Sequence, residues 1–141
     1  MIMRLASSFS TVCLTLLYAV IIAVTLPAAT ASAQSEPLLG TWSLVWEGAR
    51  DNYTGTLAVA KKVGNSVFQA KLTLIKSDGT RVTQDASLTV SGNEIRIECS
   101  NPDVKPWNPD RFYVVRAGNR MEGYSLDTAG QRGRKIVFTR R

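Results

Sequence analysis

The chain has 141 residues and a formal net charge of +6, from 17 lysines and arginines against 11 aspartates and glutamates. It contains no histidine and only two cysteines. These counts remove the commonest general base and the ligands of most zinc or iron sites, so we expect neither an enzyme nor a protein that holds a metal or another cofactor.

The first 33 residues have the layout of a signal peptide. Arg4 is followed by an apolar stretch over residues 12–26 and then by Ala31, Ser32 and Ala33, the small-residue pattern that signal peptidase cleaves. We therefore expect residues 1–33 to be removed and residues 34–141 to form one domain that is periplasmic or secreted. Because the apolar stretch is shorter than the roughly 20 residues of a membrane-spanning helix, we expect no membrane span after cleavage. An uncleaved anchor is the alternative.

Cysteine usage limits how the exported domain is stabilised. Cys13 lies in the expected signal peptide, so Cys99 remains alone and cannot form an internal disulfide. Cys99 continues the apolar phase of Ile95 and Ile97, which favours a small buried side chain. A disulfide-linked dimer is the alternative.

Alternation of apolar and polar residues predicts eight strands and no helix in residues 34–141. The first two strands cover residues 41–46 and 53–60. Three more form a meander, with apolar residues on every second position through 68–74, 82–90 and 95–99, joined by turns at 77–79 and 91–93. Three prolines make residues 101–110 the one long irregular connection. The last strands are expected over 111–117, 120–127 and 135–141, with turns at 118–119 and 129–133.

Connections of this length predict one architecture. A Greek-key sandwich needs long crossings between two sheets, whereas nearly all connections here are as short as those of hairpins. We therefore predict an all-β fold, an eight-stranded antiparallel up-and-down β-barrel over residues 34–141.

Three short motifs resemble the calycin group, which comprises the lipocalins, fatty-acid-binding proteins and avidins. Residues 40–42, Gly-Thr-Trp, resemble the Gly-x-Trp motif at the start of the first calycin strand. Residues 136–140, Ile-Val-Phe-Thr-Arg, are similar to the last calycin strand, and residues 53–56, Tyr-Thr-Gly-Thr, resemble the second strand of avidins. The resemblance implies a barrel closed at one end by Trp42 and Arg140, and a role in binding a small ligand.

Two differences from the calycin motifs limit which ligand the resemblance implies. Avidins bind biotin through an asparagine and a tyrosine at positions where this chain has Leu44 and Leu57. The Thr-Asp-Tyr motif of typical lipocalins is also absent. Biotin is therefore not the expected ligand, and side chains can fill the interior of so small a barrel.

Aromatic residues with polar tips are the candidate ligand-binding residues, because they anchor small apolar ligands and partner proteins alike. We expect five of them to line one barrel mouth, together with the single polar residue on the apolar face of its strand. The six candidates are Trp46, Tyr53, Gln84, Trp107, Tyr113 and Tyr124. Two alternatives stay open: Gln84 is satisfied by an internal hydrogen bond, and Trp107 only caps the barrel end.

Charged residues suggest less specific roles. The carboxylate pairs Glu47 with Asp51 and Asp103 with Asp110 lie in polar loops, where we expect ionised surface groups rather than catalytic ones. A basic cluster near the C-terminus either contacts an anionic surface or partner, or protects a solvated edge strand from aggregation. Its members are Arg132, Arg134, Lys135, Arg140 and Arg141.

The function predicted from the sequence is that of an exported calycin-like protein that binds a small apolar ligand. The alternatives are a protein-interaction module, such as an inhibitor of a secreted hydrolase acting through the loops near Trp107 and Glu47, and an envelope-associated structural protein. Export and the lack of a recognition motif disfavour nucleic acid. An open cavity of a few hundred Å³ would favour the ligand, and a filled core the partner.

Overall fold

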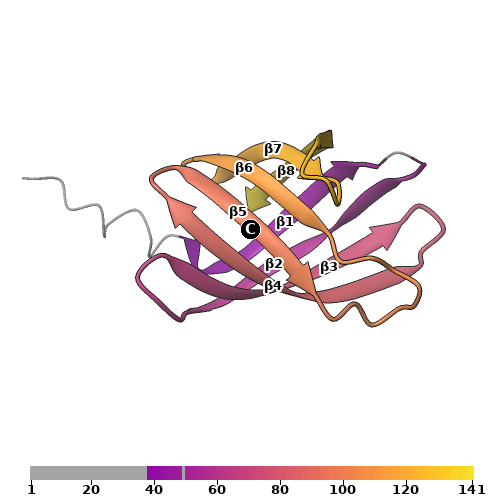
Figure 1. The fold of residues 1–141 in the computed structure, drawn as a ribbon, viewed down its shortest axis with the longest axis horizontal. Helices are drawn as coiled ribbons and strands as arrows, with labels where there is room; N and C mark the ends of the chain where they lie inside the picture. The colour runs from indigo at the N-terminus through magenta and orange to yellow at the C-terminus, as the bar shows by residue number, and fades with distance from the viewer. Residues whose placement is uncertain (1–37, 49) are drawn as a thin grey trace, which may run out of the picture.

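The computed structural model describes residues 38–48 and 50–141, which form eight antiparallel strands closed into one barrel (Figure 1). The predicted fold class is therefore confirmed, whereas the expected signal peptide, residues 1–33, lies outside the described residues. The strands are β1 (Gly40–Glu47), β2 (Asn52–Lys62), β3 (Val67–Lys76), β4 (Arg81–Ser91), β5 (Glu94–Ser100), β6 (Arg111–Ala117), β7 (Arg120–Leu126) and β8 (Arg132–Arg140).

Each strand pairs with the next in sequence, and β8 returns to pair with β1. The closing register runs from Trp42 opposite Arg140 to Trp46 opposite Ile136. The interpretation of the C-terminal basic residues as guards of an open edge is therefore wrong, because β8 is hydrogen-bonded on both sides.

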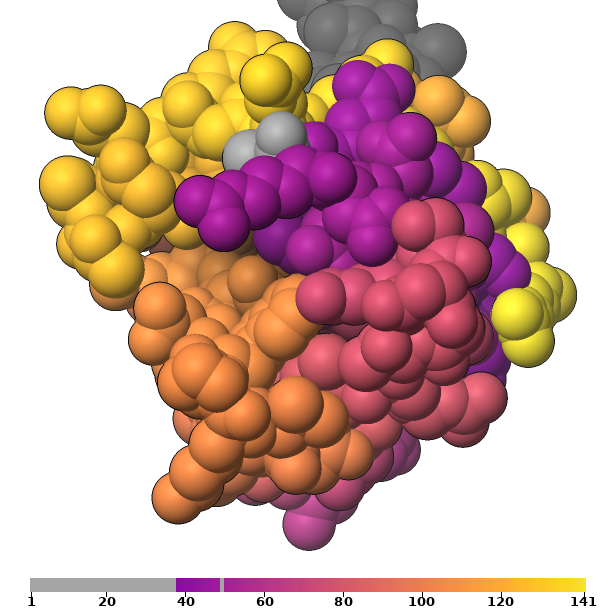
Figure 2. Space-filling model, turned by 90° about the vertical axis from the view of Figure 1, so that its right-hand side faces the viewer, coloured from indigo at the N-terminus to yellow at the C-terminus, as the bar shows by residue number. Residues whose placement is uncertain are grey.

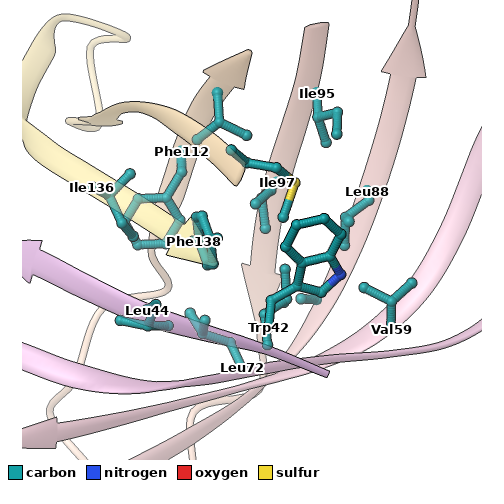
Figure 3. Close-up of a cluster of buried hydrophobic side chains, with 14 of the residues drawn as sticks. Trp42, Leu44, Val59, Leu72, Leu88, Ile95, Ile97, Phe112, Ile136 and Phe138 are labelled. Carbon is teal, nitrogen blue, oxygen red and sulfur yellow. The ribbon is translucent and has the colours of Figure 1, made fainter. Parts of the chain in front are cut away.

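Alternation along the strands fills the barrel interior. In β4, for example, Val82, Gln84, Ala86 and Leu88 are buried, while the residues between them are exposed or half-buried. Figure 3 shows buried side chains from different strands pointing toward one another, with Trp42 at the centre of the group. The interior contains leucines, isoleucines and three phenylalanines, all 2 % exposed or less. Side chains therefore occupy the middle of the barrel.

Two glycines let neighbouring strands approach closely. A Cβ atom on Gly55 would collide with the carbonyl oxygen of Thr73, and one on Gly123 would collide with that of Tyr113. Glycine inside a strand marks such close backbone approach and lets the wall of a barrel bend. These two positions therefore help to close the barrel.

The last strand begins earlier than the sequence predicts. Gly133 was expected in the turn before residue 135, but it lies within β8, which starts at Arg132. A side chain on Gly133 would collide with the Oγ atom of Ser125, and that hydroxyl accepts a hydrogen bond of 3.0 Å from the backbone N–H of Arg134. Gly133 thus makes room for a contact between strands.

The up-and-down order gives the barrel two different ends. One end, here called the sealed end, carries the start of β1, the end of β8 and the tight β2–β3, β4–β5 and β6–β7 turns. The other, here called the loop end, carries the β1–β2, β3–β4, β5–β6 and β7–β8 connections. In Figure 1 the sealed end is at the left and the loop end at the right.

Candidate functional site

The sealed end is built around the indole of Trp42, which is fully buried. Its Nε1 atom donates a 3.0 Å hydrogen bond to the carbonyl oxygen of Leu38. The guanidinium carbons of Arg140 and Arg116 lie 5.1 and 5.6 Å from the centre of its ring. Arg140 also donates a 2.6 Å hydrogen bond to the carbonyl oxygen of Leu39. Every polar group of this arrangement serves the protein itself, so we assign the sealed end a structural role.

The loop end contains the aromatic cluster, defined as Trp46, Tyr53, Trp107 and Phe112. Trp46 and Tyr53 form a cross-strand pair whose rings stack at 4.8 Å between centroids. Phe112 and Trp46 pack edge to face with 5.3 Å between ring centroids, and Trp107 and Tyr53 do so with 5.9 Å. Figure 2 faces this end of the barrel, where the β1–β2, β3–β4, β5–β6 and β7–β8 connections come together.

Strand phase explains the orientation of three members of the cluster. Trp46 follows the buried residues Trp42 and Leu44 at the same period of two, and Tyr53 precedes the buried Gly55 and Leu57 in the same way. Phe112 is fully buried at the start of β6. These three rings therefore point inward at the loop end of the barrel.

Trp107 reaches the cluster from the β5–β6 connection. Its backbone N–H donates to the carbonyl oxygen of Val104 at 3.1 Å, and its indole Nε1 donates to Asp110 Oδ2 at 2.9 Å. The ammonium of Lys76 lies 5.6 Å from the centre of the Trp107 ring. Trp107 thus covers the mouth, held by its own loop and by the last residue of β3.

Gln84 and Asp110 form a reciprocal pair beneath that loop. The Gln84 side-chain amide donates to Asp110 Oδ2 at 2.5 Å, and its carbonyl accepts from the Asp110 backbone N–H at 3.1 Å. Gln84 is 1 % exposed, and these hydrogen bonds satisfy its buried side-chain amide. Gln84 was expected either to form an internal hydrogen bond or to contact a ligand, and these contacts are internal hydrogen bonds.

Asp110 differs from the sequence expectation. It was expected to be an ordinary surface carboxylate, which is wrong, because it lies partly buried under the loop and accepts hydrogen bonds from Gln84 and Trp107. Burial raises the pKa of Asp110, and those two hydrogen bonds oppose the rise. Its expected partner Asp103 is exposed and accepts a 2.7 Å hydrogen bond from the backbone N–H of Thr83, so it anchors the loop to β4.

One donor in the aromatic cluster has no acceptor. The Nε1 atom of Trp46 is buried and has no hydrogen-bond partner among the described residues. Beside it, burial and the nearby Asp51 carboxylate raise the pKa of the Tyr53 hydroxyl. The mouth therefore combines apolar ring surface with one unused N–H donor.

The structure separates the six candidate residues into two groups. Trp46, Tyr53, Gln84 and Trp107 meet at the mouth, whereas Tyr113 and Tyr124 lie on the outer wall. The sequence already indicated the outward orientation of Tyr113, because it lies between the apolar residues Phe112 and Val114, and both of these are buried. Nothing local in the sequence marks Asp110, whose partner Gln84 is 26 positions away.

Cys99 lies under the same connection. It is buried, and its backbone N–H donates to the carbonyl oxygen of Asp110 at 2.9 Å. Burial, with a smaller contribution from the Asp110 charge, raises the pKa of the Cys99 thiol. The position matches the interpretation of Cys99 as a small buried side chain, and an intermolecular disulfide would require the β5–β6 connection to move away from it.

The described part of the chain offers neither a metal site nor a membrane-spanning helix. Residues 38–48 and 50–141 contain no cluster of three or more Asp, Glu or Cys side chains that would hold a metal ion. None of these residues belongs to a helix with the length and hydropathy of a membrane span.

Comparisons with known proteins bear on the fold. No protein-family model and no curated protein matches this chain. It is similar to a redesigned beta barrel, mFAP1, solved bound to DFHBI, at 14 % identity and a TM-score of 0.62 over 75 % of this chain and 96 % of that one. A second redesigned barrel has 11 % identity and a TM-score of 0.64 over 75 % and 93 % of the two chains. A de novo designed fluorescence-activating barrel has 21 % identity and a TM-score of 0.55 over 75 % and 95 %. At these identities the likeness shows a shared closed β-barrel fold.

Proposed function

We propose that this chain is an exported, calycin-like protein that binds a small, largely apolar ligand at the loop end of its barrel. The observation that carries the proposal is the buried Nε1 atom of Trp46, which lacks a hydrogen-bond partner in the middle of the aromatic cluster. Leaving a buried donor unsatisfied costs about 1–3 kcal/mol. An acceptor atom brought by a ligand offsets that cost.

The chemistry of the cluster defines the ligand class. The ring faces of Trp46, Tyr53 and Trp107 favour a flat, apolar molecule, and the Trp46 N–H favours one carbonyl or ether oxygen on it. Because buried side chains fill the barrel below Phe112, the ligand binds at the mouth and packs against the Trp107 ring rather than entering the core.

Two further observations support the proposal. One solved barrel of the same fold is bound to DFHBI, so a barrel of this size accommodates a small molecule. The N-terminal composition supports export, and the lack of histidine supports binding rather than catalysis.

A second candidate function is favoured by the packing of the core. Since side chains occupy the interior, the loop end can instead present Trp107 to a protein partner, as an inhibitor of a secreted hydrolase would. Trp107 is half-buried and lies in the longest connection, which suits an anchor residue.

Fluorescence titration with two neutral probes tests the first candidate. N-phenylnaphthylamine offers rings without a carbonyl, and Prodan is a naphthyl ketone with a carbonyl acceptor. We expect saturable binding of both and weaker binding of both to Trp107→Ala. We expect Trp46→Phe, which keeps a ring but removes the N–H, to weaken Prodan alone, by about fivefold.

Val115→Ala, at an exposed position of β6 outside both the aromatic cluster and the outer-wall tyrosines, is the control and should bind both probes as the wild type does. Native mass spectrometry of protein from its own host then separates the two candidates. A retained small molecule supports the first, whereas no probe binding together with a co-purifying protein supports the second.

A further inference from the structure

The outer wall of β5 to β8 carries a row of aromatic and basic side chains. In the strand register Arg96 lies opposite Tyr113, Tyr113 opposite Tyr124, and Tyr124 opposite Lys135. Arg96 and Tyr113 each lie between two buried residues and therefore face outward, and Tyr124 and Lys135 share that face because they continue the same row of opposite residues. Two tyrosines thus stand side by side with a cation at each end of the row.

The two tyrosines form a continuous aromatic surface. Their ring centroids are 5.4 Å apart with an angle of 31° between the planes, and the Arg132 guanidinium lies 4.5 Å from the centre of the Tyr124 ring. A guanidinium stacked on a ring keeps its N–H groups free to bind an anion in the plane of the stack.

A hollow of about 240 Å³ lies over this surface, and we call it the tyrosine groove. Figure 2 shows a recess between the yellow β7–β8 turn and the orange β5–β6 segment. The groove is smaller than the pockets of about 300–1,000 Å³ that hold drug-sized ligands, so it suits a molecule built on one ring. Its side-chain lining is provided mainly by Arg96, Glu98, Arg111, Tyr113, Tyr124 and Leu126.

The charges around the groove leave arginines available. Lys135 and Arg120 both pair with Glu122, at 2.7 and 3.0 Å. By contrast, Arg96, Arg111 and Arg132 form no ion pair with a carboxylate of the described residues. The Glu94 carboxylate interacts with the Tyr113 hydroxyl.

We propose that the tyrosine groove binds a small aromatic anion, whose ring packs on Tyr113 and Tyr124 and whose carboxylate or phosphate is held by Arg111 and Arg96. Guanidinium groups match the geometry of both anions and make the stronger, charge-assisted hydrogen bonds. Glu98 lies opposite Arg111 in the register, so its charge selects against an extended polyanion and in favour of a single anionic group.

This inference is independent of the proposed function. The groove is lined mainly by outward side chains of β5 to β7, whereas the aromatic cluster uses inward side chains at the mouth, and Phe112 is the one residue that borders both. A result that excludes binding at one site therefore does not exclude binding at the other.

Titration of the isotope-labelled protein by two-dimensional NMR tests the groove with probes that share a ring or a charge. Phenyl phosphate and benzoate carry both, inorganic phosphate and acetate lack the ring, and benzyl alcohol lacks the charge. We expect phenyl phosphate or benzoate to shift the signals of β5 to β7, and the three incomplete probes to bind at least about tenfold more weakly. The relative affinity of the two complete probes distinguishes a phosphate ligand from a carboxylate ligand.

Variants locate the effect. We expect Arg111→Gln to weaken binding about tenfold, and Tyr124→Leu to remove the preference for ringed anions over ring-free ones. Arg81→Gln, which removes an exposed arginine from the start of β4 outside the groove, is the control for net charge and should leave binding unchanged.

Unchanged signals from the sealed end show that each variant is folded. Equal binding of phosphate and phenyl phosphate, equal losses in Arg111→Gln and Arg81→Gln, or shifts confined to the mouth would overturn the proposal.

Discussion

The two ends of the barrel each place a tryptophan of β1 among aromatic or cationic neighbours, but with opposite results. At the sealed end the Trp42 indole N–H donates to Leu38, and two guanidiniums lie over the ring. At the loop end the Trp46 indole N–H has no acceptor among the described residues, and the ring packs against other rings. The same residue type, four positions apart on one strand, thus completes the fold at one end and leaves a binding capacity unused at the other.

The difference shows how to separate structural from functional aromatics. Full burial and a satisfied N–H mark Trp42 as structural, whereas a partly exposed ring with an unsatisfied N–H marks Trp46 as a candidate for recognition. Hydrogen-bond satisfaction distinguishes the two better than sequence spacing, because both residues lie on the apolar phase of β1.

Replacing each of these two tryptophans by alanine compares them directly. Trp42→Ala removes a fully buried indole and should lower the free energy of unfolding by about 3–5 kcal/mol, while Trp46→Ala should cost clearly less because its ring is partly exposed. Equilibrium urea denaturation measures both variants. Equal losses would show that the loop end is as structural as the sealed end.

Gln84→Leu tests how the mouth is held together. The substitution leaves the Asp110 backbone N–H without an acceptor and removes a donor from its carboxylate, so we expect a loss of about 1–3 kcal/mol. Faster hydrogen exchange in residues 101–110 than in the wild type should accompany it. Unchanged exchange there, with the whole barrel destabilised, would mean that Gln84 acts only through core packing.

Arg140→Lys tests whether the planar guanidinium of Arg140 stabilises the sealed end. Lysine keeps the charge but has no planar group to stack on Trp42 while also donating to Leu39, so we expect a loss of about 1 kcal/mol in urea denaturation. Arg134→Lys, at an exposed position of β8, is the matched control and should be neutral. If both variants match the wild type, the charge of Arg140 alone is sufficient.

The smallest effect is a pH dependence at the mouth. Because the folded pKa of Asp110 is raised above its unfolded value, the folded chain holds that proton more tightly, and this contribution to stability is lost as pH rises through the folded pKa. Asp110→Asn cannot titrate, so we expect its stability relative to the wild type to improve from pH 3 to pH 7.

Urea midpoints of both proteins across this pH range measure the difference. The lowered pKa values of the exposed Asp78 and Asp85 and of the half-buried Glu122 are common to both proteins and therefore cancel. A wild type that gains stability relative to Asp110→Asn as pH rises would show that the ionised form of Asp110 is the one the fold favours.

The sequence predicted the barrel well because period-two alternation is a local signal. The meander of β3, β4 and β5 alternates almost without exception, and the alternation continues through Phe112 and Val114 in β6. The start of β8 was misplaced because Gly133 reads as a turn residue in the sequence, and only its contact with Ser125 on the neighbouring strand explains it.

The site was less predictable because burial of a polar group depends on distant partners. Asp110 lies in a stretch of prolines and polar residues, and its environment is set by Gln84 on another strand and by the fold of its own loop around Trp107. Tyr113 and Tyr124 show the opposite case, since their strand phase already placed them outside while their ring chemistry suggested the mouth.

The position of Cys99 gives this protein an internal reporter of motion. A thiol reacts as its thiolate, and Cys99 is both shielded from solvent and tied through its backbone N–H to the loop that carries Asp110. Alkylation of this sulfur requires that loop to move away, so the rate of labelling reports how often the loop opens. A compound bound at the mouth should slow the reaction without touching the sulfur.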